Sequence, residues 1–308
     1  MARKKVEPKF KEVTLHQHDL ANYLMCPRRF ALSRSYKPRV LKKALNIGDL
    51  FARSVYWLHE GKGVEECMLY INKFQEELLN RATSQEQVDE LETSVVVAQS
   101  MILGYEAKFI KEYKPVMPII TRLVPENRFE MEIINGGYKF TYVNRLDGLV
   151  YDQFDNPWVL ELKTTSMFDK SLFDKLPTNF QINSYWLAAE YSLKRPVAGV
   201  LYRYILKPLL RQKKNESLDQ YRQRIMLDYT TYPDEYMKET SIFFSKPNLE
   251  EFKKDMNIYF GELVRSLVLN RWEKRGTACE NKFGLCDYIK YCGDPVIETL
   301  ETFYERIG

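Results

Sequence analysis

The chain has 308 residues, of which 45% are hydrophobic and 29% are charged, and its formal net charge is +4. This length and composition are typical of one large globular domain or two intertwined lobes, and they exclude a disordered or collagen-like chain. No run of 18 apolar residues predicts a membrane span, and no apolar segment of a secretory signal follows the basic start. We therefore expect a cytoplasmic protein whose cysteines are thiols or metal ligands.

Apolar residues at helical spacing dominate the first third of the chain. They follow a charged, unpatterned segment, which we expect to be a loose arm, at residues 1–15. The helices predicted by this spacing cover residues 20–32, 42–60, 64–80 and 85–112, the last ending before Pro115.

The period changes in the middle of the chain, where strands are predicted. They cover residues 128–134, 138–143, 146–151, 158–163 and 197–206, with a helix at 180–192 before the last strand. Asn135-Gly136-Gly137 predicts a hairpin turn between the first two strands. The order indicates an α/β fold whose mixed sheet contains a right-handed crossover. Two further helices are predicted at 217–229 and 249–272, before a cysteine-containing end.

Two carboxylates and a lysine stand out on the predicted strands. Alternation places Glu161 and Lys163 on one face of a strand, and a short turn brings Asp147 beside them from the preceding strand. Paired carboxylates repel each other unless a cation lies between them, and their hard oxygens suit Mg²⁺ or Mn²⁺. The backbone carbonyl of Leu162 is a further candidate ligand. Lys163 would position an attacking water or stabilise charge on a phosphate.

A second pair of polar residues lies on the helix that follows. Gln181 and Tyr185 are four residues apart, so they share one helix face. Their neutral hydrogen-bonding groups are suited to positioning a phosphate or the lysine of the preceding strand.

Asp147, Glu161-x-Lys163-Thr164-Thr165 and Gln181-x-x-x-Tyr185 together resemble the PD-(D/E)XK nuclease superfamily. The pattern is most similar to its RecB-like branch, which includes phage exonucleases and CRISPR-associated exonucleases. The resemblance implies a restriction-endonuclease-like core and a Mg²⁺- or Mn²⁺-dependent DNA exonuclease acting in recombination, repair or processing. Asp147, Glu161 and Leu162 would then bind the metal, and Lys163, Gln181 and Tyr185 would complete the catalytic site. The alternative from the residues alone is a surface salt-bridge cluster.

One position departs from this pattern. Members of the branch often carry a metal-binding histidine four residues after a glycine on an early helix. Here Gly48 matches the glycine, but the corresponding position is Ala52. His59 lies two helical turns further on and could substitute, although an isolated histidine on a helix more often has no such role.

Four of the five cysteines gather toward the two ends of the chain. Cys26 lies in a Cys-Pro-Arg context, and Cys279, Cys286 and Cys292 follow near the C-terminus as C-x₆-C-x₅-C. Four soft ligands hold either a [4Fe–4S] cluster or Zn²⁺, and the spacing alone leaves both open. The resemblance implies the iron–sulfur cluster of the same branch. Cys67 lies within a helical pattern and is expected in the core.

A basic stretch runs from Arg203 to Arg224. Arg203, Lys207 and Arg211 are candidates for DNA phosphate contacts, and the tyrosines between the cations, Tyr202, Tyr204 and Tyr221, are candidates for stacking on unpaired bases. The other interpretation is a solvated charged loop whose tyrosines belong to the core.

We expect one intertwined unit of three regions. They are a helical N-terminal region at 1–115 that contributes Cys26, a nuclease core at 116–210, and a helical C-terminal region at 211–308 with the cysteine triplet. DNA is the expected partner, and a homo-oligomer or a recombination or helicase partner is left open. The sequence contains no P-loop motif, so any helicase motor would have to be a separate partner. The alternatives are a catalytically weak DNA-binding module of the same fold and a Zn²⁺-stabilised structural protein.

Overall fold

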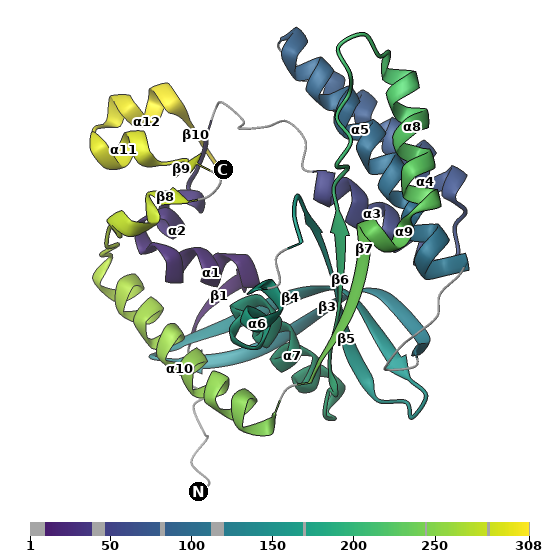
Figure 1. The fold of residues 1–308 in the computed structure, drawn as a ribbon. Helices are drawn as coiled ribbons and strands as arrows, with labels where there is room; N and C mark the ends of the chain where they lie inside the picture. The colour runs from purple at the N-terminus through teal and green to yellow at the C-terminus, as the bar shows by residue number, and fades with distance from the viewer. Residues whose placement is uncertain are drawn as a thin grey trace, which may run out of the picture.

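The computed structural model describes residues 10–38, 47–80, 84–111, 120–168, 171–243, 245–281 and 284–307. A mixed sheet of six strands forms the centre of the molecule, in the order β1-β4-β5-β6-β7, with β3 paired to β4 (Figure 1). The strands are β1 (Lys11–His16), β3 (Ile120–Asn135), β4 (Tyr138–Asp152), β5 (Pro157–Thr165), β6 (Gly199–Leu206) and β7 (Met237–Phe243).

The sheet divides along one edge of β4. β3 pairs with β4 over most of its length, so β1 and β5 share the opposite edge. β1 runs parallel to residues 138–143, whereas β5 runs antiparallel to residues 148–151. Residues 144–147 lie between these two pairings and bond to neither strand in the described register. This fork in the sheet positions the candidate site.

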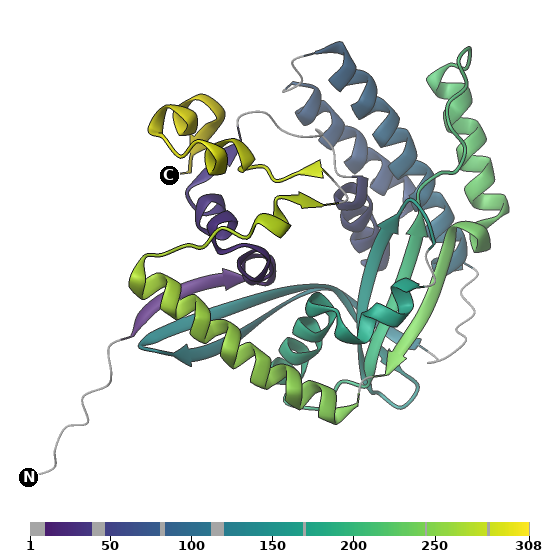
Figure 2. The same ribbon diagram turned by 60° about the vertical axis from the view of Figure 1, so that its left-hand side comes forward.

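Helices cover both faces of the sheet (Figures 1 and 2). A lobe that we call the helical lobe packs through one core cluster against Leu162, Ile205 and Met237. It contains α3 (Ile47–His59), α4 (Val64–Leu79), α5 (Gln85–Glu106) with the π-turn Ala107–Lys111, α8 (Leu218–Thr231) and α9 (Pro233–Tyr236). Gly104 of α5 allows the close approach of α8, since an added Cβ would lie 2.9 Å from the Tyr229 ring.

The opposite face is covered by three other helices. α1 (Gln17–Met25), α7 (Phe180–Leu193) and α10 (Lys246–Leu269) bury Phe140 and Tyr142 of β4 and Tyr202 of β6. The short elements α6 (Ser171–Lys175) and η2 (Leu176–Thr178) precede α7. None of the described helices combines the length and the hydropathy needed to cross a membrane.

The two ends of the chain meet in a third group of elements. β10 pairs with β2, and the Tyr288 hydroxyl donates to the Tyr36 carbonyl at 2.7 Å. The Arg28 amide likewise donates to the Glu273 carbonyl at 3.0 Å. The elements are α2 (Pro27–Ser33), β2 (Tyr36–Pro38), η3 (Gly276–Ala278), β8 (Glu280–Asn281), β9 (Gly284–Leu285), α11 (Ile289–Gly293), α12 (Ile297–Phe303) and β10 (Tyr304–Arg306).

The α/β class and the mixed sheet are confirmed, and the helices at 64–80 and 180–192 and the strands at 158–163 and 197–206 match the sequence pattern. The turn after Asn135 is also confirmed, because Gly136 and Gly137 have φ of 53° and 81°, which favour glycine.

Three expectations about local structure were wrong. The last part of the arm expected at residues 1–15 is instead β1 at Lys11–His16, which pairs with β4, and residues 1–9 lie outside the described residues. Residues 138–143 and 146–151 form one continuous strand instead of two. The helix expected at 20–32 breaks at Cys26, whose φ of −159° precedes Pro27. Residues 42–46 and 112–119, including Pro115, lie outside the described residues.

Candidate active site and cysteine pocket

Asp147 and Glu161 meet at the fork in the sheet. Gly148 and Leu160 form the last described pair between β4 and β5, and Asp147 and Glu161 are the next residue on each strand. Their backbones separate there, and the Leu162 amide donates to Asp147 Oδ2 at 2.8 Å. A carboxylate thus takes the place of a backbone acceptor at the point where the two strands part.

The Glu161 carboxyl group lies in an unusual environment for a charge. It is 2% exposed, and its Oε2 has no hydrogen-bond partner among the described residues. Burial raises the pKa of Glu161 well above its ordinary value, the nearby Asp147 raises it further, and Lys163 opposes the rise. A divalent cation would satisfy the bare oxygen and offset the repulsion, so the donor set fits a hard metal ion that keeps several waters. No group of three histidine, cysteine or acidic side chains in the described ranges is arranged to hold a metal ion.

α7 carries Gln181 and Tyr185, the pair predicted from the sequence, and Tyr185 lies close to the Glu161 carboxylate. Gln181 Nε2 donates to the Tyr185 hydroxyl at 2.8 Å, as their spacing implied. Burial raises the pKa of Tyr185, and the charge of Glu161 adds to the rise, which indicates that the ring lies close to that carboxylate. Lys163 is exposed, two residues beyond Glu161 on the same strand. The structure therefore brings the five predicted catalytic side chains to one place.

Two tyrosines near this site do not have the base-stacking role that the sequence suggested. Tyr202 and Tyr204 pair with Glu161 and Lys163 in the parallel β5–β6 register, and they are 5% and 1% exposed. Burial raises the pKa of both hydroxyl groups, that of Tyr204 to about 12, and the Glu161 charge adds to each rise. Buried rings cannot stack on bases, so that interpretation is wrong here, as it is for Tyr221 at 4% exposure. Tyr202 and Tyr204 are two residues apart, as are Glu161 and Lys163, and this shared spacing could have predicted that both tyrosines face the same side of the sheet.

The partly buried His59 and the buried Arg203 belong to one polar network on the other face of the sheet. His59 Nε2 and the Tyr105 hydroxyl share a hydrogen bond of 2.8 Å, and Arg203 donates to the same hydroxyl at 2.6 Å. Arg203 also donates to Glu239 at 2.7 Å and is 2% exposed. Burial, and then the Arg203 charge, lowers the pKa of His59 to about 3. We therefore assign neither His59 to the metal nor Arg203 to DNA.

The four predicted cysteine ligands surround one cavity. Cys26, Cys279, Cys286 and Cys292 line a pocket of about 200 Å³ between α2 and the C-terminal elements. The pKa of the Cys292 thiol is raised by burial and, to smaller extents, by the charges of the other three, so the four sulfurs lie near one another. Arg29 and Lys274 also line the cavity. These cations would partly offset the negative charge of bound thiolates.

The size of this pocket bears on what it could hold. A tetrahedral Zn²⁺ requires four sulfurs at about 2.3 Å from one point. The described residues contain no set of three ligands close enough for a single ion, although four thiols face a common cavity. Cys67 is fully buried in the helical lobe and bonds to the Ser54 carbonyl, as expected for a core thiol.

A forked mixed sheet that brings a buried carboxylate and a second, partly exposed one together beside a lysine is typical of metal-dependent nucleases. The family described as the PD-(D/E)XK nuclease superfamily matches residues 15–293, and the chain belongs to this superfamily. No curated protein matches the chain. A solved structure described as "Crystal structure of SSO0001" is similar to 89% of this chain and 82% of that chain, with 13% identity and a TM-score of 0.34.

Proposed function

We propose that this protein is a Mg²⁺- or Mn²⁺-dependent DNA exonuclease whose active site contains Asp147, Glu161, Lys163, Gln181 and Tyr185. The observation that carries the proposal is the buried Glu161 carboxylate, whose Oε2 lacks a partner in the described part of the chain, beside Asp147. A site that binds only DNA gains nothing from a buried acid placed beside a second acid, because both acids repel the phosphates.

Each residue has a role that its position supports. Asp147, Glu161 and the Leu162 carbonyl are the proposed metal ligands. The bound metal supplies Lewis acidity, which polarises the scissile phosphate and lowers the pKa of a water. Lys163 holds the attacking water or stabilises the charge that develops on the phosphate. Tyr185, fixed by Gln181, closes the site on the α7 side and limits the access of water to Glu161.

We further propose a [4Fe–4S] cluster in the cysteine pocket, with a structural role. The pocket joins the junction of α1 and α2 to the C-terminal elements, so a cluster would connect segments about 250 residues apart in sequence. A cluster of this kind is compatible with the reducing cytoplasm that we expect for this chain. Recombination, repair or processing of DNA is the corresponding cellular role.

A DNA-binding module without catalysis is the second candidate. The observation in its favour is Ala52, which offers no ligand atom where related nucleases carry a histidine. The two candidates differ in one measurable respect, because only the enzyme degrades DNA when metal is present.

The test is a gel assay of anaerobically purified protein on end-labelled single-stranded, double-stranded and circular DNA. Reactions contain Mg²⁺, Mn²⁺ or EDTA, and the variants are Lys163→Ala and, as a matched control, Lys254→Ala, which removes an exposed lysine from α10. We expect linear DNA to be lost only with metal, the circle to be spared, and Lys163→Ala alone to be inactive. Salt-sensitive binding without cleavage under either metal would establish the binding module instead.

A further inference from the structure

The segment that joins β6 to α8 begins at the catalytic edge of the sheet. β5 and β6 run parallel, so both end at the same edge, and the Lys207 amide donates to the Thr165 carbonyl at 2.7 Å. Thr165 lies two residues beyond Lys163. From this point residues 207–216, which we call the basic arm, rise along α8 (Figure 1). The arm therefore starts beside the proposed active site and leads away from it.

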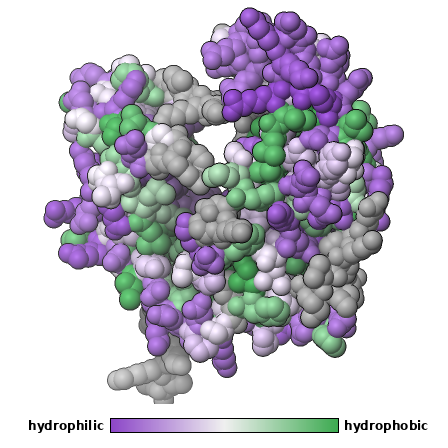
Figure 3. All heavy atoms as spheres, viewed as in Figure 1, coloured by the Kyte–Doolittle hydropathy of each residue, from purple (hydrophilic) through white to green (hydrophobic). Residues whose placement is uncertain are grey.

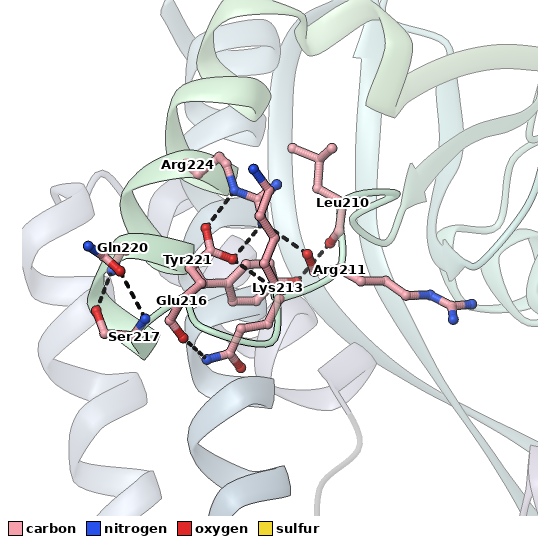
Figure 4. Close-up of polar contacts among 9 residues, drawn as sticks. Leu210, Arg211, Lys213, Glu216, Ser217, Gln220, Tyr221 and Arg224 are labelled. Carbon is pink, nitrogen blue, oxygen red and sulfur yellow. Dashed lines mark hydrogen bonds and ion pairs between the residues drawn. The ribbon is translucent and has the colours of Figure 1, made fainter.

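Glu216 holds the basic arm in one conformation. Its carboxylate accepts hydrogen bonds from the Lys213 amide at 2.9 Å and from Arg224 Nε and Nη2 at 2.7 Å each (Figure 4). Those contacts, with the Arg224 side chain first among the causes, lower the pKa of Glu216 to about 2. The carboxylate thus stays charged at every pH at which the protein would work.

Side chains of α8 fix the rest of the arm through its backbone. Arg224 Nη2 donates to the Arg211 carbonyl at 2.9 Å, and the Tyr221 hydroxyl donates to the Leu210 carbonyl, also at 2.9 Å. The Gln212 side chain closes the turn by donating to the Glu216 carbonyl at 2.9 Å. The arm is therefore a preformed structure with most of its bonds directed to α8.

The charges of this region are only partly balanced. Arg224 pairs with Glu216, and Arg222 pairs with Asp219. Arg211 and Lys214 are exposed and form no ion pair within the described residues. In Figure 4 the Arg211 side chain extends away from the other residues drawn. Hydrophilic residues gather over the part of the surface where the arm and α8 lie (Figure 3).

We propose that the basic arm is a phosphate-binding element that grips the DNA backbone beyond the scissile bond through Arg211 and Lys214. The proposal rests on the proposed function and adds the contact that holds the substrate strand. Four residues of extended chain reach at most about 14 Å, so Arg211 lies within about four phosphates of the sheet edge along one strand. Because the backbone is already fixed, binding orders only two side chains.

The first test measures DNA affinity against salt concentration for wild type, Arg211→Ala, Lys214→Ala and the control Lys254→Ala. We expect each arm variant to bind several-fold more weakly and its log–log salt slope to fall by about 0.9 on duplex or about 0.7 on single strands. The turnover rate at saturating DNA should be unchanged, because neither side chain lies in the catalytic site. Unchanged affinity and slope in both variants would overturn the arm.

The second test separates the role of Glu216 from a simple change of charge. Glu216→Gln and Asp219→Asn each remove one negative charge from the same region, but only Glu216 bonds to the backbone of the arm. We expect trypsin to cleave after Arg211, Lys213 or Lys214 faster in Glu216→Gln, with weaker DNA binding, and neither change in Asp219→Asn. Equal cleavage rates and affinities in the two variants would contradict a preformed arm.

The two proposals fail differently. If wild type neither cuts nor binds DNA, the proposed function fails and the arm fails with it. If wild type cuts DNA and both arm variants bind it as wild type does, only the arm is overturned.

Discussion

The Leu162 amide donates a hydrogen bond of 2.8 Å to Asp147 Oδ2 where β4 and β5 separate. One carboxylate oxygen of Asp147 therefore supports the backbone of β5, while the group as a whole lies beside Glu161. Asp147 thus has a structural role, its hydrogen bond to the Leu162 amide, and a proposed role as a metal ligand. A conservative substitution can remove the second role and keep the first.

Asp147→Asn should fold like the wild type and lose cleavage. The amide oxygen of asparagine can still accept the Leu162 hydrogen bond, but a neutral group binds a divalent cation weakly. A loss of several kcal/mol of transition-state stabilisation corresponds to on the order of 10³-fold in rate. Thermal unfolding and a cleavage time course, with Asp147→Ala as the variant that also loses the hydrogen bond, check this. Cleavage within tenfold of wild type would remove Asp147 from the active site.

Glu161→Gln should stabilise the metal-free protein near neutral pH. The wild-type carboxylate is buried beside Asp147, so its charge opposes folding, and glutamine removes that charge with almost the same shape. Adding Mg²⁺ or Mn²⁺ should raise the melting temperature of wild type and leave that of the variant unchanged. Melting curves in EDTA and in each metal measure both effects. An equal metal-induced shift in the two proteins would contradict Glu161 as a ligand.

Cys286→Ser should lose the visible colour of the anaerobically purified protein and its solubility together. Cys286 lines the cysteine pocket, and a hydroxyl is a poor ligand for iron. Cys67→Ser is the matched control, because Cys67 is the remaining cysteine and lies in the helical lobe. Absorbance per protein and iron and sulfide content provide the measurements. A stable, fully coloured Cys286→Ser protein would exclude the cluster.

The free energy of unfolding should decrease as the pH falls below neutrality, because the pKa of His59 is lowered in the folded protein. Its pKa is 6.5 in the unfolded chain and about 3 in the folded protein, so the unfolded state binds more protons between these values. The contribution of neutral His59 is fully present above about pH 6.5 and is lost toward pH 3, by up to about 1.4 kcal/mol per unit. Denaturant unfolding of wild type and His59→Gln at pH 4.5 to 7 tests this. Parallel pH dependences would show that His59 is not buried as a neutral base.

Local patterns in the sequence were sufficient to predict the strand and the helix that contribute to the candidate site. Alternation places Glu161 and Lys163 on one face, and the four-residue spacing joins Gln181 to Tyr185, because both relations depend only on the geometry of one strand or one helix. The hairpin at Gly136-Gly137 is similarly local.

Only the tertiary structure showed which distant segments pair and which side chains they bury. Tyr204 lies opposite Lys163 because β6 pairs with β5, and the pKa of His59 is lowered because residues of other elements surround it and Arg203 adds a nearby positive charge. β1 has little pattern of its own and is paired to the edge of β4 beside the fork. The number of charges in the basic stretch was visible in the sequence, but which of them are buried, paired or exposed depends on long-range packing. Burial and pairing are properties of the assembled fold, and no spacing along the chain contains them.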